Sequence, residues 1–172
     1  MIMKPQDVLV ALRLCLKDIP STYAKKAQDL GMSASEVHAA ERRLIAARLL
    51  DSNSHEINRD AFLRFLVNGV PFAFAVAPAE MTRGIPTAWA APVLENEFSD
   101  SNQSPPVWPD PNGKVQGVAI KPLYSSIPKI VQKIPALYDL LALLDALRIG
   151  RARERKRAEE ELGKRIKNYA TS

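Results

Sequence analysis

The feature that most constrains the fold is the chain reversal that residues 31–33 require between two helical patterns. Gly31 follows a helical pattern that Ser21 or Thr22 could cap and that ends at Leu30, and glycine commonly takes the left-handed conformation that ends a helix. Ser33 and Glu36 then have the spacing of a capping box, in which each side chain bonds to the backbone N–H of the other. The chain therefore ends one helix and begins another within about three residues, as a helix-turn-helix does.

The residues on either side of this turn favour close packing of the two helices. Ala24 and Ala27 are small and lie on the inner side of the first helix, so the second helix can approach it closely. An apolar stripe at helical spacing follows in the second helix, made of Val37, Ala40, Leu44 and Ala47.

Further elements complete an N-terminal unit over residues 1–68. A helix beginning at Pro5 carries an apolar face that includes Cys15. Residues 49–57 predict a short wing, two strands joined by a turn at Asp51–Ser54, and Asn58 caps a fourth helix.

The stretch from Thr22 to Leu50 closely resembles the winged helix-turn-helix of multiple-antibiotic-resistance-type and related bacterial regulators. The shared pattern is a small-residue helix, Leu-Gly, a Ser-capped helix with Val37 at its fourth inner position, and a Leu-Leu exit. The resemblance extends from residue 5 to about residue 66. One departure is Arg48, because such regulators usually have Gly before the exit leucines.

The resemblance implies that the helix after the turn enters the major groove of double-stranded DNA. Ser35 and His38 would reach base edges, and Arg42 would bind guanine or phosphate. The remaining expected contacts are mostly to the phosphate backbone: Lys25, Lys26, Ser33 and Arg43. Glu41 has no explanation in this arrangement. The alternative is that these residues form the solvated surface of a module that contacts proteins.

Residues 69–135 hold eleven of the thirteen prolines and predict strands and ordered loops. We expect strands at residues 70–77 and 114–121, the second after a turn at 109–113. Arg83, Trp89 and Trp108, with Thr87 and Tyr124, could line a small-molecule pocket in which Arg83 holds an anion. The favoured alternative is that the tryptophans and prolines pack a small sheet over the DNA-binding domain.

Residues 136–172 predict one long helix with an apolar first half and a basic end, and Gly150 could kink it between the two halves. Leu137, Leu141 and Leu144 start a seam that Arg148, Arg151 and Arg155 continue. The apolar residues Leu140 and Leu143 lie off this seam, and their burial between two subunits predicts a homodimer. Residues 148–172 carry nine basic and four acidic side chains. We expect Arg151 and Arg155 to contact phosphate, or these arginines to pair with Asp139 or Asp145 of a second subunit. The alternative is a solvated helix with ion pairs within it, such as Arg155–Glu159 and Arg157–Glu161.

The whole sequence predicts a mainly helical α+β protein of the cytoplasm that is not an enzyme. The single cysteine excludes a disulfide within the chain and a Cys-rich metal site, and no catalytic or cofactor motif is present. No apolar run approaches the roughly 20 residues that a membrane span needs. We expect a homodimeric, sequence-specific, double-stranded DNA-binding transcription regulator acting as a repressor. The alternative is an antitoxin or defence-system component that binds a protein partner.

Overall fold

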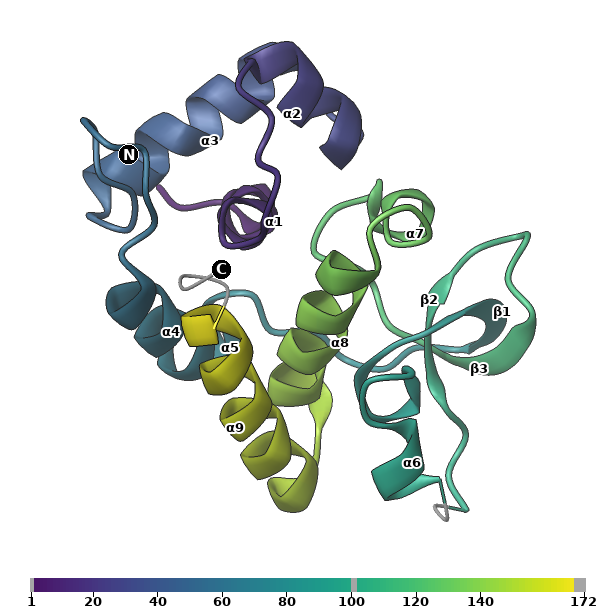
Figure 1. Cartoon of the computed structure of the whole chain (residues 1–172). Helices are drawn as coiled ribbons and strands as arrows, with labels where there is room; N and C mark the ends of the chain where they lie inside the picture. Colours follow the sequence, from purple (N-terminus) through teal and green to yellow (C-terminus); the bar gives the residue numbers. More distant parts are fainter. Residues whose placement is uncertain (1, 100–101, 169–172) are drawn as a thin grey trace.

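The computed structural model of the protein describes residues 2–99 and 102–168 (Figure 1). It is mainly helical with one small sheet, so the predicted α+β class is confirmed. The elements in chain order are α1 (Pro5–Leu14), α2 (Tyr23–Leu30), α3 (Ala34–Ala46), α4 (Arg59–Asn68), α5 (Val70–Ala73), β1 (Met81–Pro86), the 3-10 helix η1 (Ala88–Ala90), α6 (Glu95–Phe98), β2 (Pro106–Pro109), β3 (Val115–Ala119), α7 (Ile127–Ile130), α8 (Pro135–Ile149) and α9 (Ala152–Asn168).

The helix boundaries of the N-terminal region follow the predicted caps. The hydroxyl of Thr22 accepts the N–H of Lys25 at the start of α2, and Gly31 ends this helix at φ +63°. The capping box before α3 is closed in both directions, with Ser33 Oγ accepting the Glu36 N–H and Glu36 Oε2 accepting the Ser33 N–H. These local predictions are confirmed.

The segment between α3 and α4 is a minimal hairpin. Leu50 and Ile57 form its one β-bridge, and the carboxylate of Asp51 accepts the N–H groups of Asn53 and Ser54. These hydrogen bonds, that of the Ser54 amide first, lower the pKa of Asp51. The predicted wing is therefore a short turn held by its own aspartate.

The predicted strand at residues 70–77 is wrong. The chain forms the short helix α5 there, and Pro71 lies in its first turn, where the missing N–H of proline costs nothing. The predicted strand at 114–121 is confirmed, since β3 spans Val115–Ala119.

The three strands close into a small barrel. β1 pairs antiparallel with both β2 and β3, and β2 pairs parallel with β3. Closure with so few strands brings backbones very close. A Cβ atom on Gly84 would lie 2.0 Å from the carbonyl oxygen of Trp108, and one on Gly117 would lie 2.1 Å from that of Pro105.

The predicted long C-terminal helix is in fact two helices that form a hairpin, because the helix ends at Gly150, which is extended at φ −73° and ψ 159°. α9 runs back along α8, and Arg165 near its end pairs with Asp139 near the start of α8. The leucines of α8 are all buried within the chain. No leucine of α8 is therefore left for a second subunit to cover, which removes the reason for expecting a homodimer.

One continuous apolar core joins these parts. It includes residues of α1, α3, α4, η1, β2, α8 and α9. Within residues 2–99 and 102–168, no helix has the length and hydropathy that crossing a membrane requires.

Candidate nucleic-acid interface

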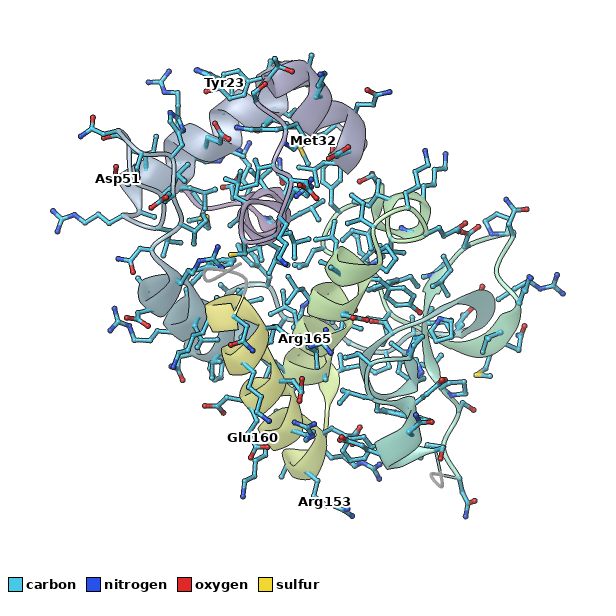
Figure 2. All side chains as sticks on the ribbon, viewed as in Figure 1. Tyr23, Met32, Asp51, Arg153, Glu160 and Arg165 are labelled. Carbon is cyan, nitrogen blue, oxygen red and sulfur yellow. The ribbon has the colours of Figure 1, made fainter. Side chains whose placement is uncertain are left out.

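The outward side of α3 is a stripe of exposed residues, Ser35, His38 and Arg42, with Ala46 one turn further. The inner side is held by Val37, Ala40 and Leu44, all buried in the core. Figure 2 shows α3 along an outer edge of the molecule, between the labelled side chains of Tyr23 and Asp51. We call Ser35, His38 and Arg42 the α3 stripe.

The charged residues of α3 outside this stripe are engaged in contacts within the chain. Glu41 is buried, and its Oε1 accepts a hydrogen bond from Lys26 Nζ at 2.8 Å. Glu41 thus has the explanation that the sequence did not provide. Lys26 is itself buried between α2 and α3, so it is not the exposed phosphate contact that we expected.

Arg43 is likewise a structural residue rather than a free phosphate contact. Its Nε and Nη2 donate to the two carboxylate oxygens of Asp7 at 2.7 and 2.8 Å. Asp7 is fully buried in the first turn of α1, and its hydrogen bonds raise the pKa of Arg43 further. This fork ties the start of α1 to the end of α3. The expectation that Arg43 faces DNA is corrected by this geometry.

The other residues of the expected interface remain on the surface. Arg42 makes no hydrogen bond or ion pair with any residue that the structure describes, and Lys25 is exposed at the start of α2. The ring of His38 meets that of Tyr23 edge to face, with centroids 5.2 Å apart. Partial burial and the neighbouring charge of Glu41 raise the pKa of Tyr23. Ser35 shares a hydrogen bond with Ser33.

Arg48, the departure from the family pattern, lies in the left-handed region at φ +62°. Most residues other than glycine avoid this region because of steric crowding at Cβ. The backbone of the turn into the wing therefore has the conformation that glycine favours, although an arginine stands there.

The start of α9 lies far from α3, whereas the end of α9 packs beside α4. Figure 2 shows Arg153, near the start of α9, at the opposite end of the molecule from Tyr23. Arg151 pairs with Glu154, and Arg155 donates to the carbonyl of Gly150. The expected phosphate contacts of Arg151 and Arg155 therefore lie outside the α3 stripe and stay a prediction. Asp139 and Asp145, expected to face a second subunit, pair with Arg165 and Arg148 of the same chain.

The residues of the speculative ligand pocket are not brought together. Trp108 is buried, and its indole N–H donates to Asp145 Oδ2 at 2.7 Å. Arg83 is exposed on β1, and Trp89 is half-buried in η1. Trp108 therefore has the packing role that the favoured alternative gave it, but it packs the barrel against α8 and not over the N-terminal domain.

Sequence reasoning missed a polar cluster centred on Asp145. This buried carboxylate accepts hydrogen bonds from Thr87, Trp108 and Arg148, while Arg148 also donates to the carbonyl of Phe74. Burial raises the pKa of Asp145, and the charge of Arg148 opposes this. The partners lie up to 58 residues away in the chain, so no local pattern could have indicated the cluster.

The Asp145 cluster holds the barrel on α8. The exposed polar surface with the clearest pattern is that of α3. Family models, curated proteins and solved structures provide no match to this chain.

Proposed function

We propose that the protein binds double-stranded DNA through the α3 stripe and acts as a transcription regulator. The observation that carries the proposal is the division of charge on α3. Glu41 and Arg43 point into the chain, and Glu36 closes the capping box. The exposed stripe contains Arg42 and two polar side chains, and it contains no acid.

Such a stripe has the chemistry that a major groove requires. A helix inserted there presents side chains to base edges, where arginine can donate two hydrogen bonds to guanine and serine or histidine can donate or accept one. Lys25, at the start of α2, is positioned to contact the phosphate backbone beside the groove. The Lys26–Glu41 pair holds α2 on α3, and the Asp7–Arg43 pair holds α1 on α3. A helix docked in a groove needs such a fixed orientation.

The test is binding of a fluorescently labelled duplex, measured by anisotropy over a series of salt concentrations. The parent protein should bind, with an affinity that falls steeply as salt rises. Arg42→Gln should weaken binding by about tenfold, because one good arginine contact contributes roughly 1–3 kcal/mol.

Arg153→Gln is the matched control, since it removes the same charge from an exposed arginine at the far end of the molecule. It should leave the affinity close to that of the parent. If the parent binds no duplex even at low salt, or if the two variants behave alike, the proposal is wrong. The interaction-protein alternative would then be the better account.

A further inference from the structure

A second basic surface lies beside the helix-turn-helix, on residues 121–133. This segment, which we call the lysine segment, carries three exposed lysines, Lys121, Lys129 and Lys133. It contains no Asp or Glu. A surface with an excess of positive charge attracts polyanions.

The lysine segment is fixed against the turn of the helix-turn-helix. Ser126 Oγ donates to the carbonyl of Leu30 at 2.6 Å, at the end of α2. The hydroxyl of Tyr124 donates to Glu36 Oε2 at 2.9 Å, in the first turn of α3. Partial burial and this hydrogen bond raise the pKa of Tyr124. Figure 1 shows α7 beside the end of α2.

The packing around Gly31 shows how close the lysine segment lies to the turn between α2 and α3. A Cβ atom at Gly31 would lie 2.8 Å from the Cβ of Ser126 and 3.5 Å from Cγ2 of Ile130. The lysine segment therefore cannot move far from the turn without breaking its contacts with both α2 and α3.

The two lysines that flank Ile130 face away from the core. Ile127, Ile130 and Val131 are buried, whereas Lys129 in α7 and Lys133 in the turn after it are exposed. Neither lysine forms an ion pair with a residue in the described parts of the chain. Both ammonium groups are available to a partner.

We propose that Lys129 and Lys133 contact the phosphate backbone of the duplex whose major groove receives α3. The inference rests on the proposed function and adds a second, sequence-independent contact surface to it. A recognition helix enters the groove with its N-terminal residues, and the strand bordering the groove passes the residues around that end. Tyr124 and Ser126 hold the lysine segment at this end of α3. Contacts from lysine to phosphate set the position of the protein without reading sequence.

The experiment compares duplex binding of Lys129→Gln/Lys133→Gln with that of Arg83→Gln/Lys114→Gln. The control pair removes two exposed charges from β1 and the turn before β3, within the same subdomain. The lysine variant should bind about tenfold more weakly, and the slope of log affinity against log salt should become shallower by about 2. The control pair should keep the slope of the parent. Far-UV circular dichroism verifies that each variant has the helicity of the parent.

Lys129→Arg/Lys133→Arg keeps the charges and should restore parental binding. If the glutamine variant of the lysine segment binds as the control pair does while Arg42→Gln is weakened, the inference fails and the proposed function stands. Failure of the arginine variant to bind would also overturn the assignment to phosphate contacts. If the parent binds no duplex at low salt, both proposals fail together.

Discussion

At the scale of single residues, the N-terminal unit depends on ion pairs whose partners the sequence alone does not reveal. Lys26 and Glu41, fifteen residues apart, are both buried and joined at 2.8 Å. Asp7 and Arg43 are 36 residues apart and form a two-pronged ion pair. Loss of one partner would leave the other charge buried and unpaired, which costs about 3–5 kcal/mol. These residues therefore serve the fold, while Arg42 beside them remains available for binding.

The strained backbone at Arg48 gives a prediction at this scale. Arg48→Gly should raise the free energy of unfolding by about 1 kcal/mol, because glycine adopts positive φ without the steric cost that arginine bears. Urea unfolding followed by circular dichroism measures the change. The adjacent Ala47 has φ −80°, so Ala47→Gly should instead lower the stability by about 0.5–1 kcal/mol. Destabilisation by Arg48→Gly would contradict the left-handed assignment.

At the scale of elements, the C-terminal hairpin replaces the dimer seam that its leucines suggested. Leu141 and Leu144 lie in the interior of one chain, among η1, α9 and the N-terminal helices. Leu141→Glu should therefore unfold the protein, because a buried unpaired carboxylate costs several kcal/mol.

The readouts are helicity and mass by light scattering. Arg153→Glu, an exposed change, should alter neither. If Leu141→Glu instead gave a folded monomer from a dimeric parent, the leucine would belong to a subunit interface and the internal hairpin would be wrong.

At this scale, the sequence predicted the features that depend on residues close together in the chain. The caps at Thr22, Ser33 and Asn58 and the left-handed Gly31 act within a few residues, so local patterns predicted them. The full helix break at Gly150 depends on what α9 packs against, so the sequence indicated at most a kink there.

The candidate site shows the same limit. Exposure of Ser35, His38 and Arg42 followed from helical periodicity. The inward turn of Lys26 and Arg43 did not, because their partners come from other helices. The place of Lys129 beside α3 depends on the path of the whole chain, and no nearby residue indicates it.

At the scale of the whole molecule, the N-terminal helices, the barrel and the C-terminal hairpin share one apolar core. The barrel is tied to α8 through Asp145, and the lysine segment is tied to the helix-turn-helix through Tyr124 and Ser126. The N-terminal helices therefore contact the rest of the chain through hydrogen bonds as well as through the shared core. A duplex would meet α3 and the lysine segment as one surface.

Binding of duplex DNA at the α3 stripe can be tested by mapping backbone amide chemical shifts during titration with a duplex. We expect the largest changes at Ser35, His38 and Arg42, with smaller ones at Lys25 and Lys129. The amides of α9 near Arg153 should serve as the internal reference and stay in place. Changes that cluster on α9 or the barrel, with the α3 stripe unmoved, would contradict the account.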